Sequence, residues 1–380
     1  MPKTRTTDVL KIRASAVQKQ GHDHFLLKEI HEQPEAVTAV LRGRLHGTSP
    51  VHLGGLNLSI GQLADIEHIF VSGCGTAFHA GVMAKYYLEQ ITGLPVSVEQ
   101  ASEFRYRHPV IPRKTLAVVV SQSGETADTR AAVQEFQKKG THTLGIVNVV
   151  GITIAREVDG GIYLHAGPEI SVASTKAFTT QVTALLLLGL RIAEAKRVVG
   201  RQARNELKEG LERLPEDILR ALEIESTIRL RAKQWAQYNH AFYLGREKLA
   251  PIAMEGALKL KEISYVHAES YPAGEMKHGA IALVDDSLLT VFLLATGPLY
   301  EKSLSNLAEV EARDGTVVVV TNSLEYVKQH EDALYVSTSS DWTAPLVLNV
   351  VLQLVAYYIA KERGCPIDQP RNLAKSVTVE

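Results

Sequence analysis

A weak internal repeat constrains the fold of this chain more than any other feature of its sequence. A shift of 172 residues, without gaps, places His68 on His240 and Gly73 on Gly245. Sparse identities of this kind can arise by chance, but here they coincide with a shared order of predicted elements. At 380 residues the chain is also too long for one ordinary core. The repeat therefore predicts two similar domains.

Both halves of the chain alternate short β-branched runs with helix-length stretches. The predicted strands are residues 68–73, 115–121, 141–149, 160–167, 240–246, 287–295, 315–323 and 332–338. Helices are predicted at 80–93, 126–140 and 345–364, and from 176 to 237 with an interruption only near Pro215. Alternation at this spacing is typical of a parallel sheet with helices on both faces. We therefore expect an α/β protein with two doubly wound parallel-sheet domains, flavodoxin-like or Rossmann-like.

The pattern divides the chain into four parts. We expect a helical N-terminal segment over 1–60, a first domain over 61–225, a second domain over 226–367 and a polar tail over 368–380. The tail would ordinarily be interpreted as a frayed terminus. Its composition is nevertheless not low in complexity.

Charge and cysteine content exclude several classes of protein. The 41 Lys and Arg residues balance 42 Asp and Glu residues, so neither nucleic acid nor an anionic membrane is expected as a partner. Cys74 and Cys365 are too few for a disulfide framework, which favours a reducing compartment. The first residues lack the apolar centre of a secretory signal, and the most apolar stretch, 184–190, is too short to span a bilayer. We therefore expect a soluble cytoplasmic protein.

A cluster of hydroxyl and amide side chains follows the predicted strand 115–121. The cluster comprises Ser121, Gln122, Ser123 and Thr126. Gly124 permits a tight turn within it, and a helix is expected to begin near Thr126, so that its free N–H groups and dipole favour an anion. Ligands of open parallel sheets bind beyond the carboxyl ends of the strands. The cluster predicts a site for a sugar phosphate, with an ordinary Ser/Thr helix cap as the alternative.

Two further loops are expected at the same edge of the first sheet. GCGTAFHAG (73–81) follows the first predicted strand, and EISVASTKAFTTQ (169–181) follows the fourth. The glycine spacing of the first loop differs from the dinucleotide fingerprint, and the sequence contains no Walker-type phosphate loop. The second half carries LATGPLY (294–300) where the hydroxyl cluster should recur. We therefore expect one phosphate site per chain.

The second half offers groups suited to acid–base chemistry. Glu255, Lys259 and Glu262 lie at i, i+4 and i+7, on one stripe of a predicted helix. The loop YPAGEMKHG (271–279), shortly after it, carries His278. From spacing alone such a stripe is more often a solvated ladder of salt bridges than a catalytic group. The histidines of this region lie too far from other potential ligands to indicate a metal site.

Five motifs, in order, resemble one enzyme family. SQSGETADT, ASTKAFTTQ, EGALKLKEISY, GEMKHG and the terminal DQPRNLAKSVTVE are similar to the isomerase part of glucosamine-6-phosphate synthase, the glutamine:fructose-6-phosphate amidotransferase. The similarity extends from about residue 25 to the end of the chain. Each motif alone is moderately specific, whereas the ordered set is highly specific. The fold of this family consists of two sugar-isomerase (SIS) domains, in agreement with the repeat.

The resemblance implies a role for each residue that matches a family motif. Glu262 matches the carboxylate that moves a proton between C1 and C2, and Lys259 matches a lysine near that acid. His278 matches a ring-opening histidine that reaches in from the neighbouring subunit, and Lys375 matches the lysine that forms a Schiff base with the open-chain ketose. The residues that match substrate-binding positions are Cys74, Gly75, Thr76, Ser121, Gln122, Ser123, Thr126, Val172, Ala173, Ser174 and Arg371. A homodimer is expected, and neither a metal nor a cofactor is implied.

The resemblance also implies a reaction, the conversion of fructose 6-phosphate to glucosamine 6-phosphate. Family members begin with a glutaminase domain whose nucleophile is the cysteine after the initiator Met, but here Pro2 follows Met1 and no cysteine precedes Cys74. We therefore expect the nitrogen to come from free ammonia or from a separate glutaminase. Two smaller departures are Ala77, where the family commonly has serine, and Ala280, where it usually has proline.

Other functions stay open at this point. The same chemistry would serve a hexose-phosphate isomerase, or a deaminase or deglycase of phosphorylated amino sugars. SIS domains also occur in non-catalytic regulators that sense sugar phosphates, but residues 1–60 show no helix-turn-helix with a basic face. The joint presence of Glu262, His278 and Lys375 favours an enzyme.

Overall fold

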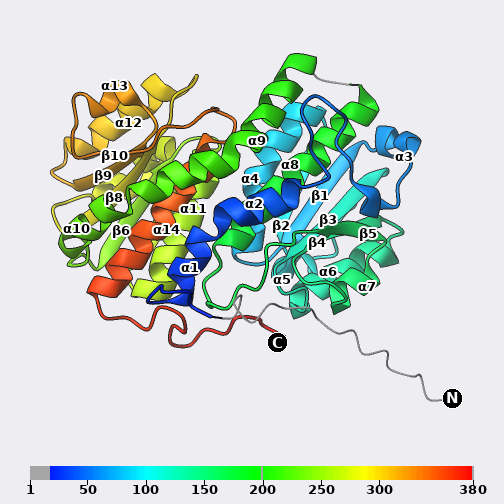
Figure 1. Cartoon of the computed structure of the whole chain (residues 1–380), viewed down its shortest axis with the longest axis horizontal. Coiled ribbons are helices and arrows are strands. Elements are labelled where there is room, and N and C mark those ends of the chain that lie inside the picture. Colours follow the sequence, from blue (N-terminus) through cyan, green and yellow to red (C-terminus); the bar gives the residue numbers. More distant parts are fainter. Residues whose placement is uncertain (1–17, 198–199, 379–380) are drawn as a thin grey trace.

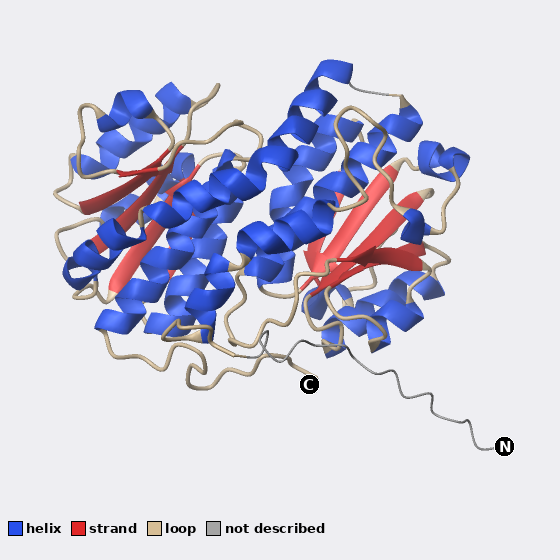
Figure 2. Cartoon of the chain, viewed as in Figure 1, coloured by secondary structure: helices blue, strands red, loops and turns tan. Residues whose placement is uncertain are grey.

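The computed structural model describes residues 18–197 and 200–378, which form two parallel five-stranded sheets (Figure 1). Every strand pair in both sheets is parallel. The strand order is β2-β1-β3-β4-β5 in the first sheet and, read in the corresponding direction, β7-β6-β8-β9-β10 in the second. Figure 2 shows that helices surround both sheets. The predicted pair of doubly wound domains is therefore confirmed, and the shared strand order agrees with the internal repeat.

The first sheet carries the loops that the sequence singled out. Its strands are β1 His68–Gly73, β2 Val96–Gln100, β3 Thr115–Ser121, β4 His142–Val147 and β5 Gly160–Tyr163. The helices that follow them are α4 Thr76–Thr92, α5 Ala101–Phe104, α6 Ala127–Lys138, α7 Thr153–Glu157 and α8 Lys176–Lys196. Strands β1 and β3 are buried along their whole lengths, as expected for central strands of a sheet covered on both faces.

The second sheet repeats this arrangement. Its strands are β6 His240–Gly245, β7 His267–Pro272, β8 Leu288–Leu294, β9 Thr316–Thr321 and β10 Leu334–Tyr335. The helices and 3₁₀ turns that follow them are α11 Leu249–Ser264, η3 Ala273–His278, η4 Ala280–Leu283, α12 Tyr300–Glu311, α13 Leu324–Val327 and α14 Ala344–Glu362.

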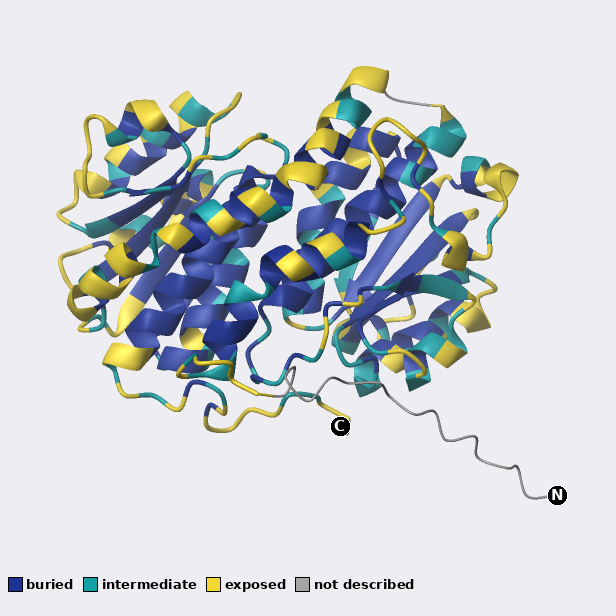
Figure 3. Ribbon diagram, in the orientation of Figure 1, coloured by how far each residue is buried: buried dark blue, intermediate teal, exposed yellow. Residues whose placement is uncertain are grey.

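A layer of helices lies between the two sheets (Figure 1). Within it α4 packs against α8, α11 packs against α14, and α4 also contacts α11 across the two domains. Two helices connect the domains, α9 Arg201–Glu223 and α10 Glu225–Trp235. Helices α8 and α14 are long and apolar enough to cross a membrane, but 89% and 94% of their most apolar windows are buried inside the protein. Both are therefore core helices, which is why the faces that they present in Figure 3 are coloured as buried.

The segment before the first sheet is partly helical, as predicted, although residues 1–17 of the predicted segment lie outside the described residues. Its elements are α1 Phe25–His31, α2 Gln33–Leu41, η2 Gly54–Leu56 and α3 Ile60–Asp65. The C-terminal tail is attached to this segment. The carboxylate of Asp368 accepts the backbone N–H groups of Phe25 and Leu26, each over 3.0 Å.

The structure corrects three details of the predicted elements. Pro215 does not interrupt the helical region, because it lies inside α9, and the breaks fall near residue 200 and at Ile224 instead. The edge strands β2 and β7 were not predicted, since their side chains are mostly half-exposed and polar. Several predicted strands are shorter, above all the two-residue β10. The domain boundaries stay a prediction.

Candidate active site

A pocket of about 170 Å³ lies beyond the carboxyl ends of β1 and β3. Chain order reverses between these two neighbouring strands, and ligands of doubly wound sheets bind at such a switch point. Both domains and the C-terminal tail contribute to the walls. The residues that line the pocket are Cys74, Thr76, Ala77, Val120, Ser121, Gln122, Ser123, Thr126, Thr129, Val172, Ser174, Gln181, Glu262, Leu373, Ala374 and Lys375.

The loop after β3 owes its shape to Gly124. The φ angle of this residue is +64°, and a Cβ there would lie 1.6 Å from Ile152 Cδ1, so no other residue fits. The N–H of Gly124 donates to Ser121 Oγ over 2.9 Å, which closes the turn. Helix α6 then begins at Ala127, with Thr126 at its N-cap position. The hydroxyl groups therefore surround the N-terminus of a twelve-residue helix, where an anion is favoured.

The C-terminal tail crosses this loop. The N–H of Ala127 donates to the carbonyl of Val377 over 3.2 Å, and Ser376 Oγ donates to Ser123 Oγ over 3.0 Å. These contacts order the tail and bring Lys375 to the pocket wall. The alternative of a frayed terminus is therefore wrong for the described part of the tail.

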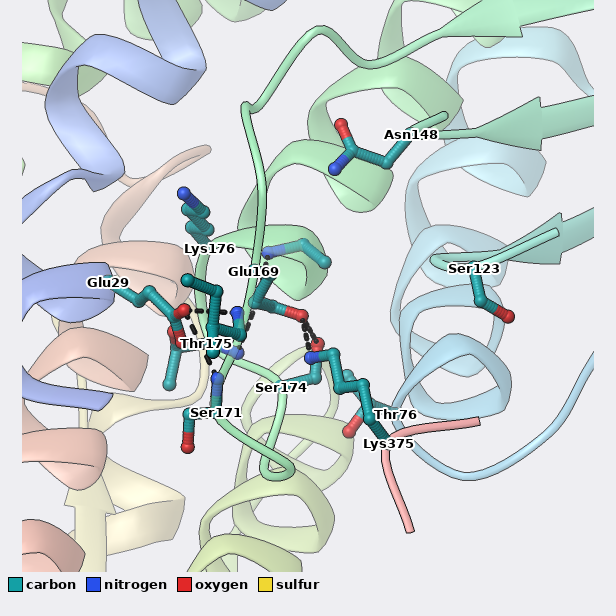
Figure 4. A network of polar contacts seen from close by, with 12 residues as sticks. Glu29, Thr76, Ser123, Asn148, Glu169, Ser171, Ser174, Thr175, Lys176 and Lys375 are labelled. Atoms are coloured by element: carbon teal, nitrogen blue, oxygen red, sulfur yellow. Dashed lines mark hydrogen bonds and ion pairs between the residues drawn. The ribbon is translucent and has the colours of Figure 1, made fainter. Parts of the chain in front are cut away.

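The amine of Lys375 is paired with a buried carboxylate. Lys375 Nζ lies 2.7 Å from Glu169 Oε2, and the exposed fractions of the two side chains are 25% and 0%. Figure 4 shows the pair beside Ser174 and Thr76. Burial alone would raise the pKa of Glu169, but the Lys375 ammonium and the hydrogen bonds to this carboxylate outweigh burial and hold the pKa below its ordinary value. Glu169 is therefore a carboxylate that faces the Lys375 amine.

Helix α11 contributes the acid–base stripe. Lys259 Nζ lies 2.6 Å from Glu262 Oε2 and 3.4 Å from Glu255 Oε1. Lys259 and Glu255 are buried, which excludes a solvated ladder of salt bridges. Burial alone would lower the pKa of the Lys259 amine, but the two carboxylates outweigh burial and raise it, so this lysine is an ammonium. Glu262 is the member of the stripe that lines the pocket.

A polar network joins this stripe to the first domain. Thr76 Oγ1 accepts a hydrogen bond from Lys259 Nζ over 3.1 Å and donates one to Glu255 Oε1 over 3.0 Å. On the next turn of α4, His79 Nδ1 donates to Glu255 Oε2 over 2.8 Å. Because Lys259 also pairs with Glu262, these contacts connect Glu262 in the second domain to the N-terminal part of α4 in the first.

The structure brings most of the predicted site residues together. Ten of them line the pocket, namely Cys74, Thr76, Ser121, Gln122, Ser123, Thr126, Val172, Ser174, Glu262 and Lys375. Gly75 and Ala173 are chain neighbours of lining residues, and Lys259 lies behind Glu262. His278 is exposed on η3 and does not line the pocket of its own chain. Arg371 is also exposed, with its guanidinium 4.1 Å from the centre of the Tyr265 ring.

Several residues of the site were missed by the sequence analysis. Glu169 is the most important of these, because it pairs with Lys375. The sequence could have indicated it, since Glu169 precedes a hydroxyl-rich run and a predicted helix, and acidic residues favour helix N-termini. His79 had no such signal, since its contact with Glu255 spans 176 residues of sequence. Thr129 and Gln181 also line the pocket. The methyl group of Ala77 stands where the resemblance led us to expect a serine.

Comparisons with known proteins agree with this architecture. The chain is 46% identical to the glutamine–fructose-6-phosphate aminotransferase (isomerizing) of Caldanaerobacter subterraneus subsp. tengcongensis over 98% of its length, and 44% identical to that of Methanosarcina acetivorans over its whole length. It covers 61% and 62% of those two proteins, so it spans about three fifths of the curated relatives that it matches.

Solved structures show the same relationship. The C-terminal domain of glucosamine-fructose-6-phosphate aminotransferase from Francisella tularensis superposes with a TM-score of 0.87 at 39% identity, covering 93% of this chain and all of that one. A glucosamine-6-phosphate deaminase from Thermotoga maritima shares the fold, with a TM-score of 0.73 at 23% identity, covering 93% of this chain and 99% of that one. The SIS domain pattern matches residues 62–191 and 235–362, one match for each sheet. The chain therefore belongs to the SIS domain family, with two copies of the domain in tandem.

Proposed function

We propose that this chain converts fructose 6-phosphate to glucosamine 6-phosphate, with ammonia as the nitrogen donor. One observation carries the proposal: a single pocket is lined by the hydroxyl-rich loop 121–126, the carboxylate of Glu262 and the amine of Lys375. Amination of a ketose phosphate by this route needs an anion site, a proton carrier and a nucleophilic amine. The loop, Glu262 and Lys375 would serve these three needs in that order. The names of the curated relatives, which are aminotransferases of fructose 6-phosphate, support the same reaction.

The loop after β3 would hold the phosphate. Ser121, Ser123 and Thr126 offer hydroxyl donors, Gln122 offers an amide, and the N-terminus of α6 lies among them. None of these four groups is charged. They would therefore bind the phosphate without the tight grip of an arginine cluster, which suits a substrate that must leave as product.

The ring of the ketose must open before its carbonyl carbon can react. Ring opening moves one proton onto the ring oxygen and another off the C2 hydroxyl, which a histidine can do near neutral pH. His278 lies outside the pocket of its own chain and is exposed on η3. We therefore assign ring opening to His278 of the partner subunit, which requires at least a homodimer.

Lys375 would form an imine at C2 of the open ketose. The amine adds to the carbonyl carbon, water leaves, and the positive charge on the nitrogen makes the C1 hydrogens more acidic. Ammonia then displaces the lysine at C2. This exchange leaves the substrate with its new nitrogen and returns Lys375 to the enzyme.

Glu262 would complete the isomerisation. Its carboxylate takes a proton from C1 and returns it to C2, while the C1 hydroxyl proton passes to the nitrogen, so that C1 becomes an aldehyde and C2 carries the amine. The Lys259 ammonium lies 2.6 Å from this carboxylate and holds it in place. The exposed fraction of the Glu262 side chain, 21%, is compatible with access from the pocket.

The nitrogen source and the cellular setting belong to the proposal as well. The relatives are named for glutamine, but the described residues of this chain lie in the SIS domains and the segments that flank them. We propose that free ammonia, or ammonia released by a separate glutaminase, enters the pocket. A soluble cytoplasmic homodimer is the form that we expect to be active.

Incubation of the purified chain with fructose 6-phosphate tests the proposal. Glucosamine 6-phosphate should form with ammonium chloride, whereas glutamine should not replace ammonium unless a glutaminase is added. Conversion to glucose 6-phosphate alone would overturn the proposed amination. Consumption of glucosamine 6-phosphate without any synthesis would show that the enzyme works as a deaminase instead. Binding of fructose 6-phosphate with no product under any of these conditions would indicate a sensor.

A further inference from the structure

Glu169 contacts both the N-terminus of a helix and the amine of Lys375. Its Oε1 accepts the N–H groups of Thr175 and Ala177, over 2.9 and 3.1 Å, at the N-terminus of the 21-residue helix α8. Its Oε2 accepts the hydroxyl of Ser174 over 3.0 Å and faces the Lys375 ammonium. A carboxylate at a helix N-terminus is stabilised by the free N–H groups and by the helix dipole. One oxygen of Glu169 is thus held by the fold, while the other is directed at the reactive amine (Figure 4).

A second acid nearby, Glu29, has a raised pKa, whereas the pKa of Glu169 is lowered. Glu29, on α1, accepts the N–H groups of Ile170 and Ser171 with one oxygen, and its other oxygen is buried without a hydrogen-bond partner among the described residues. Burial, followed by the charge of Glu169, raises the pKa of Glu29 to about 8. Near neutral pH the two acids therefore contribute one negative charge, on Glu169, against the one ammonium of Lys375.

The remaining charges around the pair have partners of their own. Lys176, on α8, lies 2.6 Å from Glu32. Lys259, on α11, is paired with Glu262. Glu169 is consequently the carboxylate that balances Lys375.

Imine formation conserves this charge. A lysine ammonium and a ketone give a protonated imine and one water molecule, so the nitrogen carries one positive charge before and after the reaction. The proton that the amine releases in order to attack is regained by the nitrogen or by the leaving hydroxyl. A carboxylate that balances the ammonium can therefore balance the protonated imine in the same place.

We propose that Glu169 is the counter-ion of the protonated imine that Lys375 forms with the ketose. The inference rests on the proposed function, and it adds Glu169 to the site as the residue that balances the charge of the imine. Protonation of the imine makes C2 electrophilic enough for ammonia to add and displace the lysine, so Glu169 sustains the exchange that precedes proton removal by Glu262. Because the carboxylate is buried, water competes little for this contact.

Borohydride trapping with fructose 6-phosphate tests the proposal, with the mass of the intact protein as the readout. Wild type should gain the mass of the reduced adduct at Lys375. Glu169→Gln keeps an oxygen for the helix N-terminus but removes the charge, and should trap about 10- to 100-fold more slowly at neutral pH. The alkaline limb of its trapping profile should move to lower pH, because an unbalanced imine loses its proton more readily.

Glu29→Gln is the matched control. It replaces a neighbouring acid that is already neutral near pH 7, so trapping should proceed at the wild-type rate. Fructose 6-phosphate affinity should change little in either variant, since the phosphate loop is untouched. If Glu169→Gln fails to fold, Glu169→Asp is the alternative variant. It keeps the negative charge but moves it one methylene farther from Lys375, so trapping should be slower and the alkaline limb of the profile should lie at lower pH.

The outcomes separate the two proposals. Equal trapping rates and equal pH profiles in wild type and folded Glu169 variants would overturn the counter-ion role and leave the proposed function standing. Absence of any adduct at Lys375 in active wild-type enzyme would overturn both. Slow trapping in both Glu169→Gln and Glu29→Gln would show a general disturbance of the loop rather than a counter-ion.

Discussion

The hydroxyl of Thr76 in the first domain donates a hydrogen bond to the carboxylate of Glu255 in the second, with 3.0 Å between the two oxygen atoms. The same carboxylate accepts a hydrogen bond from His79 and lies 3.4 Å from the ammonium of Lys259. Because Glu255 is fully buried, these contacts replace the water that it would otherwise bind. Thr76, His79 and Lys259 therefore converge on one carboxylate where α4 meets α11.

Glu255→Gln should destabilise the protein by about 2–4 kcal/mol, because it leaves the buried Lys259 ammonium with one carboxylate instead of two. Urea unfolding at neutral pH measures the change. His79→Asn is the matched variant on the other side of the contact, and should lose only about 1 kcal/mol because its side chain is partly exposed. Equal losses in the two variants would contradict the central place of Glu255.

Gly124→Ala should disrupt the phosphate loop. The added methyl group would overlap Ile152, and alanine is strained at a φ of +64°, so we expect a loss of roughly 1–3 kcal/mol in stability and at least tenfold in fructose 6-phosphate affinity. Gly140→Ala is the control, because Gly140 has a φ of +69° but no atom near its missing Cβ. Calorimetric titration should show unchanged affinity in the control, and a similar affinity loss at both positions would refute the argument.

Glu262→Gln should bind fructose 6-phosphate but turn it over roughly 10²- to 10⁴-fold more slowly, which is the range for loss of a general acid–base group. The amide keeps the shape of the side chain but cannot carry the proton between C1 and C2. Glucosamine 6-phosphate formation under saturating ammonium is the measurement. Glu301→Gln, which alters an exposed acid on α12 of the same domain, should be fully active. Turnover at the wild-type rate in Glu262→Gln would remove this residue from the mechanism.

Mixed dimers can test whether His278 acts across subunits. His278→Ala and Glu262→Gln should each be nearly inactive alone. After co-expression, a dimer with one chain of each kind contains one site with both groups intact, so random mixing should restore about a quarter of the wild-type sites. A mixture as inactive as its components would show that His278 serves the site of its own chain or none.

Glu29 should make the stability of the protein depend on pH. Its pKa is raised from 4.5 to about 8 in the folded chain, so the folded state holds a proton that the unfolded state releases between these values. The contribution is therefore fully present below pH 4.5 and is lost as the pH rises through about 8, on the order of a few kcal/mol in the free energy of unfolding.

Glu29→Gln should flatten this dependence, since the amide stays neutral at every pH. Urea unfolding from pH 5 to pH 9 measures the two slopes. Glu35→Gln, which alters an exposed acid on α2, should keep the wild-type slope. A Glu29→Gln variant whose stability falls as steeply as that of wild type would contradict the assignment.

The central strands could be predicted from the sequence almost to the residue. Strands β1 and β3 have the predicted bounds, 68–73 and 115–121, because both faces are buried and most positions carry an apolar or small side chain. The edge strands β2 and β7 could not be predicted this way. One side of an edge strand meets solvent, so its polar residues resemble those of a loop.

The residues of the candidate site also fall into a group that could be predicted from the sequence and a group that could not. The hydroxyl loop 121–126 was evident because its residues are adjacent in sequence and follow a recognisable strand. The partners of Lys375 and Glu255 were not evident, since the contacts Lys375–Glu169 and Glu255–His79 join residues 206 and 176 positions apart.

The sequence by itself determined the repeat, the parallel α/β architecture and the location of the hydroxyl-rich loop 121–126, because these follow from short-range periodicity and local turn chemistry. Only the tertiary structure decided that Glu255 and Lys259 are buried rather than solvated, and that Glu169 faces Lys375. Whether a charged group lies in water or against another charge depends on which distant segments pack around it. Spacing along one helix cannot report such packing, so only the folded arrangement of the two domains determines which charged groups are paired.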